Sequence, residues 1–273
     1  MVSREVLRVR ASDLSHLSPA SVGAPTAMPA RETEAIILKT FPLGEADRVV
    51  SFFGRTSGRL RGVAAGARRL NNRFGSTLEM LSHVRIWYVE RETRELVRIQ
   101  QAELLESLHK AQSDYGLSTG LAVISEIAEM VLPEHEVSEA MFRLMILTAR
   151  EIERTGQWEL PLSYFAFWTV RLGGWLPRFD RCAACRAVFG ASAGFYDTHH
   201  AGLFCRNCRR TGMKPLYAEA RVVAERFAGE RLDRIGYDKA IGSHIAALRA
   251  AAFAWIELNA ERRLTTPELL ETT

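Results

Sequence analysis

The sequence predicts an α+β protein of several domains, in which a small β barrel precedes a helical domain that a four-cysteine module interrupts. Three observations carry this prediction. Short β-prone runs fill residues 31–106, apolar residues with helical spacing fill residues 107–177 and 215–273, and all four cysteines lie within residues 178–214. A chain of 273 residues with 47% hydrophobic content is long enough for two or three modest cores.

Residues 1–30 mix Ser, Pro, Ala and Gly without sustained periodicity. Such a segment buries too little apolar surface to offset the entropy lost on ordering. We therefore predict a disordered N-terminal extension over residues 1–30 and assign no function to it.

Residues 31–106 are expected to form five short strands. Alternation is clearest in the fourth strand, where Val84, Ile86 and Tyr88 face one way. Five strands in about 75 residues, with both faces partly apolar, favour a closed barrel of the oligonucleotide-binding (OB) type, while a split sandwich or an SH3-like barrel remains an alternative. The predicted strands cover residues 34–40, 48–53, 59–65, 83–90 and 94–104.

Residues 107–177 and 215–273 are expected to form one helical domain. Three apolar stripes of helical period are centred near Ile124, Met145 and Phe165. They end before Pro133, Gly156 and Gly173, which are common residues at helix ends. Further helices are predicted over residues 218–231 and 241–258, with a short one opening at Pro267.

The four cysteines form two matched pairs, Cys182-Ala-Ala-Cys185 and Cys205-Arg-Asn-Cys208, with nineteen residues between them. Two such knuckles can supply the four thiolates of a tetrahedral zinc shell, and the spacing is typical of a zinc ribbon. We predict that residues 178–214, the cysteine module, form a zinc-binding module with one Zn²⁺ per chain. Four sulfur ligands leave no open position, so this metal has a structural role. The predicted ligands are Cys182, Cys185, Cys205 and Cys208.

Other roles for the cysteines are less favoured. Two disulfides, or four unrelated buried thiols, are unexpected in a chain without secretory features. A redox motif usually consists of one Cys-x-x-Cys pair opening a helix, whereas here two pairs flank a hairpin-like segment over residues 193–204. His199 and His200 lie within that segment and can in principle replace a ligand, but we expect them at its solvated tip.

The net charge of +4 and the pI of 9.0 make the chain mildly basic. The arrangement of charge is more informative, because seven arginines and no acidic residue occur between Arg48 and Arg73. Residues 66–75 combine arginines with two asparagines and one phenylalanine, a composition suited to following a phosphate backbone without reading bases. The predicted nucleic-acid contacts are Arg59, Arg61, Arg68, Arg69 and Arg73.

The alternative for this run is an ordinary solvated arginine-rich surface. Phe74, Trp87 and Tyr88 offer stacking faces for unpaired bases, but aromatic residues in short strands more often face the core. No apolar run is long enough to cross a bilayer, and the N-terminus lacks a signal-peptide core, so we expect a soluble cytoplasmic protein.

An enzyme, such as a zinc-ribbon nuclease or a nucleotide-dependent remodeller, is the main functional alternative. The sequence has no Gly-x-x-x-x-Gly-Lys-Ser/Thr loop, and the arginine run has no carboxylate cluster of the kind a two-metal nuclease needs. Glu45 and Asp47 stand at its edge and are expected to hydrogen-bond the turn. A purely structural adaptor is a third alternative, which DNA titration distinguishes from a binding protein.

Several motifs resemble the RecO family of bacterial DNA repair proteins. Glu34-Ala-Ile-Ile-Leu-Lys-Thr40, Gly44-Glu-Ala-Asp-Arg48 and Gly66-Ala-Arg-Arg69 are similar to the start of that family's barrel. Phe167-Trp-Thr-Val-Arg-Leu-Gly-Gly-Trp-Leu-Pro177 is similar to the helix that leads into its cysteine module. The resemblance covers about residues 31–270, and the order and spacing of the motifs are more specific than any one of them.

The resemblance implies a non-enzymatic recombination mediator. Such a protein binds single- and double-stranded DNA, anneals complementary strands and works with RecR. It also engages the acidic tail of the single-stranded DNA-binding protein so that RecA can load. This sequence departs from the family pattern in its N-terminal extension and in Arg186, which stands where a glycine often follows the second cysteine. Neither departure touches a predicted zinc ligand.

Overall fold

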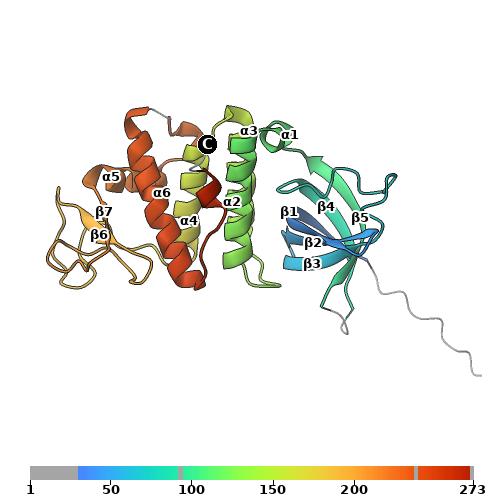
Figure 1. Ribbon diagram of the computed structural model, residues 1–273, viewed down its shortest axis with the longest axis horizontal. Helices are drawn as coiled ribbons and strands as arrows, with labels where there is room; N and C mark the ends of the chain where they lie inside the picture. The colour runs from blue at the N-terminus through green and yellow to red at the C-terminus, as the bar shows by residue number, and fades with distance from the viewer. Residues whose placement is uncertain (1–29, 92–94, 237–238, 271–273) are drawn as a thin grey trace, which may run out of the picture.

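The structure is a computed structural model that describes residues 30–91, 95–236 and 239–270. The β barrel lies at one end of an elongated molecule, the helices form the middle, and the cysteine module lies at the other end (Figure 1). The predicted disordered extension, residues 1–30, falls almost wholly outside the described residues.

Five strands form the closed barrel in the order β1-β2-β3-β5-β4. The β3–β5 pair is parallel and the other pairs are antiparallel, which confirms the predicted five-stranded barrel. The strands are β1 (Arg31–Leu43), β2 (Asp47–Gly54), β3 (Gly58–Ala64), β4 (His83–Val89) and β5 (Val97–Glu106).

Strand β1 is longer than predicted because it serves two neighbours. Residues from Arg31 to Ile36 pair with β4, and residues from Ala35 to Leu43 pair with β2. Both ends of β1 are exposed, so the pattern of buried apolar residues from which we predicted the strand is confined to its middle. The barrel is filled by its own core, to which Tyr88 and Phe74 belong with 2% and 1% exposure, so neither is a stacking platform.

The helical domain contains α1 (His109–Ser113), α2 (Tyr115–Val131), α3 (Glu139–Thr155), α4 (Glu159–Leu172), α5 (Ala218–Gly229), α6 (Lys239–Ala260) and α7 (Pro267–Leu270). The side chain of Ser138 caps the start of α3, and Gly156 ends that helix with φ +66°. Among these helices, only the short α1 was not predicted. None of the described helices combines the length and apolar character needed to cross a membrane.

The only regular secondary structure of the cysteine module is the short strand β6 (Gly194–Tyr196), which pairs with β7 (Lys214–Leu216) at the end of the module, so the module depends on the helices beside it. The rings of Phe179 and Tyr196 pack against Trp255 of α6 at centroid distances of 6.1 and 6.0 Å. Arg221 of α5, which is 7% exposed, donates hydrogen bonds to the carbonyls of Phe179, Gly190 and Ser192. These contacts fix the module to the helical domain.

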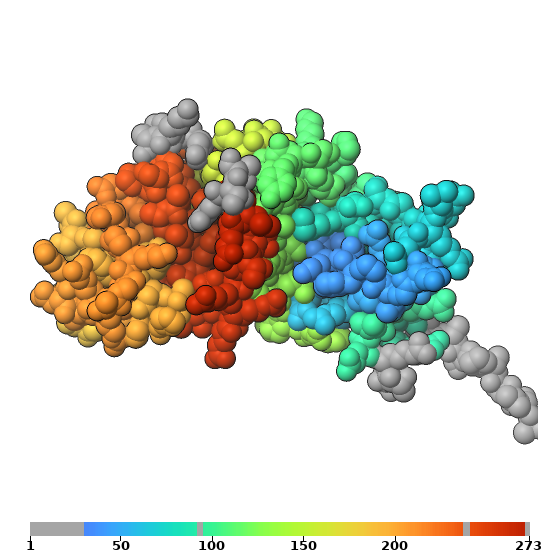
Figure 2. All heavy atoms as spheres, viewed as in Figure 1, coloured from blue at the N-terminus to red at the C-terminus, as the bar shows by residue number. Residues whose placement is uncertain are grey.

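The barrel is also fixed to the helical domain. Ile36, Leu38 and Phe53 point away from the barrel's own core and join the main helical core. Gly58 has φ +73°, and a Cβ there would lie 2.5 Å from the backbone of His135, so this close approach requires glycine. Figure 2 shows the result as one continuous body, with α2, α6 and α7 between the barrel and the module on this face.

Candidate metal centre and nucleic-acid surface

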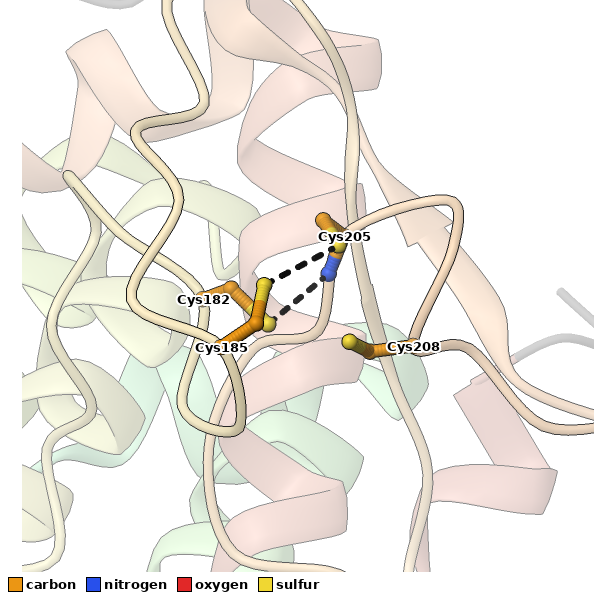
Figure 3. A group of neighbouring side chains, drawn as sticks. All are labelled: Cys182, Cys185, Cys205 and Cys208. Atoms are coloured by element: carbon orange, nitrogen blue, oxygen red, sulfur yellow. Dashed lines mark hydrogen bonds between the residues drawn. The ribbon is translucent and has the colours of Figure 1, made fainter.

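The four cysteines converge on one point (Figure 3). All four are free thiols, and their Sγ atoms lie within 4.8 Å of one another, with 3.7 Å between Cys185 and Cys205. Metal–sulfur bonds of about 2.3 Å in a tetrahedral shell place the sulfurs roughly 3.8 Å apart. The arrangement can therefore hold a metal ion. The four cysteines form no disulfide bond with one another, in contrast to the alternative of two disulfides.

Backbone hydrogen bonds shape the two knuckles. Within the first, the N–H of Arg186 donates to the carbonyl of Cys182 at 3.0 Å, and within the second, the N–H of Arg209 donates to that of Cys205 at 2.9 Å. The N–H of Ala183 donates to the carbonyl of Leu203 and ties the knuckles together. These turns aim both sulfurs of each pair inward.

The thiols differ in how readily they ionise. Burial opposes ionisation of Cys182, but backbone N–H groups of Cys185, Cys205 and Ala184 outweigh it and lower the pKa of Cys182 to about 6. The neighbouring sulfurs of Cys185 and Cys205 raise the pKa of Cys208 to about 12. A divalent cation bound among the four sulfurs would favour their thiolate forms.

The two histidines of the module lie apart from the sulfurs. Asp197 accepts hydrogen bonds from the backbone N–H groups of both His199 and His200, and its carboxylate lies 2.8 Å from Nδ1 of His200. The cluster of possible metal ligands contains the four cysteines and neither histidine. The histidines form the hairpin turn, as the sequence predicted.

The arginine run is less uniform in space than in sequence. Arg59 is only 8% exposed, its Nε donates to the carbonyl of Leu132 at 2.8 Å, and its guanidinium pairs with Glu129 and Glu134. Arg61 is half-exposed and lies 3.7 Å from Glu134. Arg59 thus ties the barrel to the segment after α2, and this burial removes it from the surface that we predicted to contact nucleic acid.

A third member of the run, Arg55, is also paired. It contacts Glu139 at 2.6 Å and Glu34 at 3.0 Å, and Glu139 in turn has a lowered pKa because it accepts hydrogen bonds from Arg55. The seven arginines of the run therefore do not form one uncompensated positive surface in the folded chain. The compensating carboxylates come from β1 and from the α2–α3 region, far away in sequence, and so no local count could reveal them.

The exposed basic part of the arginine run is the loop of residues 66–75 between β3 and β4, which we call the arginine loop. Arg68, Arg69 and Arg73 are exposed there, and within the described part of the chain no carboxylate lies within 4.0 Å of their charged nitrogens. Leu70, at the centre of the loop, is 100% exposed. The loop thus presents three uncompensated guanidinium groups to solvent.

The arginine loop has a fixed shape despite its exposure. Ala67 and Phe74 are buried in the barrel core and anchor its two ends. The Arg68 guanidinium donates to the carbonyl of Gly44 at 2.6 Å, and Oδ1 of Asn72 accepts the N–H groups of Phe74 and Gly75. A preformed loop gives up little conformational entropy on binding.

The acidic residues at the edge of the loop have a structural contact. Of the two residues predicted to hydrogen-bond the turn, Asp47 does so: its Oδ1 accepts the backbone N–H of Gly66 at 2.8 Å. In the described ranges, the cysteines form the one cluster of three or more His, Cys, Asp or Glu residues that can hold a metal ion.

From the sequence, Arg143, Arg150 and Arg171 could line a basic groove for an acidic peptide, and the structure places the first two, but not Arg171, on a cavity of about 770 Å³ between the barrel and helices α3 and α4. Its floor is apolar, Arg143 and Arg150 stand at its rim, and burial lowers the pKa of His83 on its barrel wall. Helical arginines are common on any surface, so only the fold shows that these two share a cavity. The apolar lining consists of Phe142, Leu144, Ile146, Leu147, Trp168 and Leu172.

Comparison with known proteins matches both parts of this architecture. Residues 28–108 match the family profile described as "Recombination protein O N terminal", and residues 112–268 match "Recombination protein O C terminal". The chain belongs to the RecO family. A role in DNA repair and recombination follows from this membership.

Individual RecO family members match from about two thirds to nearly nine tenths of the chain. The protein named "DNA repair protein RecO" of Koribacter versatilis is 33% identical over 241 residues, which is 88% of this chain and 98% of that relative. Proteins of the same name from Nocardioides sp. and Syntrophobacter fumaroxidans are both 36% identical, covering 66% and 65% of this chain and 74% and 71% of those relatives.

We predict that the purified chain carries one tightly held divalent metal ion and that Cys205→Ser removes it. Because metal binding here contributes to folding, the melting temperature should fall by roughly 5–10 °C. Elemental analysis and thermal unfolding measure both effects, and His200→Ala is the matched control that should keep the metal. Wild-type protein with well under one metal per chain, or a Cys205→Ser protein with unchanged melting, would contradict this prediction.

Proposed function

We propose that this chain is a DNA-binding recombination mediator that anneals complementary strands without ATP and helps RecR to load RecA on coated single strands in the cytoplasm. The observation that supports this most is the arginine loop on an OB-type barrel, where Arg68, Arg69 and Arg73 are exposed and, among the described residues, have no carboxylate within 4.0 Å of their charged nitrogens. Arginine contacts to phosphates confer affinity for both single- and double-stranded DNA with little sequence preference.

The chemistry of annealing follows from these groups. Two strands repel each other through their phosphates, and guanidinium groups that neutralise phosphates lower this repulsion. Base pairing then supplies the free energy of joining, so the reaction needs no nucleotide hydrolysis. The rival proposal, a zinc-ribbon nuclease, needs carboxylates near the loop, but Asp47 already accepts a backbone hydrogen bond there.

We propose Zn²⁺ as the metal and a structural role for it. Cys182, Cys185, Cys205 and Cys208 would hold it as thiolates, and four soft sulfur donors with tetrahedral spacing favour zinc. When bound, the ion neutralises the clustered thiolates and fixes the two knuckles in place. The chain's own contribution is the turns that aim the sulfurs inward and the helices that support the module.

We propose the cavity between the barrel and helices α3 and α4 as the site for the acidic tail of the single-stranded DNA-binding protein. Its apolar floor suits apolar side chains of a peptide, and Arg143 at the rim suits the carboxylates. Arg150 also stands at the rim, although it already pairs with Glu106 at 2.7 Å. Arg143 is therefore the residue that we expect to attract the tail.

In nucleotide-free buffer, wild-type protein should anneal complementary labelled oligonucleotides faster than buffer alone, and more slowly as salt rises. The variant Arg68→Ala/Arg69→Ala should anneal at least about tenfold more slowly near physiological salt, because it neutralises two fewer phosphates. Fluorescence energy transfer between the strands measures the rate. Acceleration that appears only with ATP, or a loop variant as fast as wild type, would overturn the proposal.

On strands coated with the matching single-stranded DNA-binding protein, Arg143→Glu should slow annealing, while bare strands should anneal normally. Reversing a rim charge should weaken binding of the acidic tail by roughly tenfold. Binding of the isolated tail peptide, followed by fluorescence anisotropy, measures this directly, with Arg234→Glu as the control. Equal tail affinity in both variants and wild type would exclude the cavity as the tail site.

A further inference from the structure

The tip of the cysteine module carries a second group of arginines. Arg186, Arg206 and Arg209 each follow a cysteine directly in sequence, and Arg210 comes next. Because the four sulfurs lie within 4.8 Å of one another, these arginines gather around the metal centre. All four are exposed, and in the part of the chain that the structure describes no carboxylate lies within 4.0 Å of their charged nitrogens. We call this group the tip arginines.

The backbone at Arg186 has a conformation that is uncommon for a residue other than glycine. Arg186 has φ +65°, in the left-handed region that favours glycine. A non-glycine residue there is uncommon, and the knuckle turn after Cys185 requires this backbone conformation. This position places a guanidinium group beside Cys185.

Two of the other tip arginines are held in position by aromatic rings. The guanidinium of Arg209 lies 4.9 Å from the ring centroid of Phe195, and that of Arg210 lies 6.0 Å from that of Phe204. A cavity of about 360 Å³ lies on the side of the first knuckle and is lined by Arg186 and Trp175 among others, together with Arg178 and Arg181, which both pair with Asp180. Guanidinium groups that are already placed give up less entropy when they bind a phosphate.

We infer that the tip arginines form a second nucleic-acid contact surface, which binds the phosphate backbone of another strand. This inference rests on the proposed DNA-binding function and extends it. The barrel with its arginine loop and the cysteine module lie at opposite ends of the molecule (Figure 1), so one chain can hold two strands at once. The metal centre then has a second effect besides its structural role, because it holds the tip arginines in position to bind phosphate.

The chemistry of the tip favours phosphate over an acidic protein. Val188 is the one large hydrophobic residue of the described module that is exposed, whereas protein interfaces usually need a buried cluster of apolar anchors. Phosphate contacts need only correctly placed guanidinium groups. An amide side chain, Asn207, lies between Arg206 and Cys208 and can donate to further phosphate oxygens.

The test uses the full-length protein and two non-complementary single strands, one labelled with a donor and one with an acceptor. Energy transfer between them reports simultaneous binding of both strands. The variant Arg186→Gly/Arg206→Ala keeps every metal ligand and places glycine where the backbone favours it. Metal content and melting temperature should therefore stay equal to or above wild type. A matched control, Arg234→Ala/Arg262→Ala, removes the same charge elsewhere.

Wild type and the control variant should show strand bridging, and the tip variant should show at most about one third of it, because two phosphate-binding guanidinium groups are absent. The affinity of the tip variant for a single strand should differ from that of wild type by less than threefold, since the arginine loop is unchanged. A tip variant that bridges as well as wild type would overturn this inference and leave the proposed function intact. That outcome would instead indicate that the tip arginines contact a protein partner or only solvent. Wild-type protein that binds no DNA would refute the proposed function itself.

Discussion

One side of the barrel packs into the hydrophobic core of the helices, and the positions of all the functional surfaces depend on this contact. Ile36, Leu38 and Phe53 leave the barrel interior and pack among the helices, where Ser125 also donates to the carbonyl of Leu38 at 2.6 Å. At about 25 cal/mol per Å² of buried apolar surface, such packing outweighs the weak ion pairs at the surface. The arginine loop, the cavity and the cysteine module are therefore held at fixed positions on one body.

Arginine has two different tasks in this chain. Arg59 and Arg221 are buried, and each ties a peripheral part of the molecule to the helices through hydrogen bonds to backbone carbonyls. Arg68, Arg69 and Arg73 are exposed at the surface of the barrel. Both tasks suit a planar cation with five N–H donors, which explains how a chain with 32 arginines and 4 lysines can use one residue type for structure and for binding.

The sequence sufficed to predict the barrel, the helices and the cysteine cluster, because each has a local signature: alternation, helical period or the Cys-x-x-Cys spacing. It did not predict which arginines are free. Arg55, Arg59 and Arg61 belong to an acid-free stretch, yet they meet Glu34, Glu129, Glu134 and Glu139 in space. The sequence suggested Arg143 and Arg150 as lining of a basic groove, but it did not place the cavity between the barrel and α3 and α4, since its walls come from segments that only the fold brings together.

The most direct test of phosphate binding by the arginine loop is the dependence of DNA affinity on salt. On single strands of unrelated sequence, we expect the slope of log affinity against log salt to become shallower by about 1.4 in the Arg68→Ala/Arg69→Ala variant, or about 0.7 for each phosphate that is no longer neutralised. The slope should be unchanged in Arg234→Ala/Arg262→Ala. An unchanged slope in the loop variant, or a weakening of affinity confined to one DNA sequence, would contradict the central claim that this loop binds the phosphate backbone.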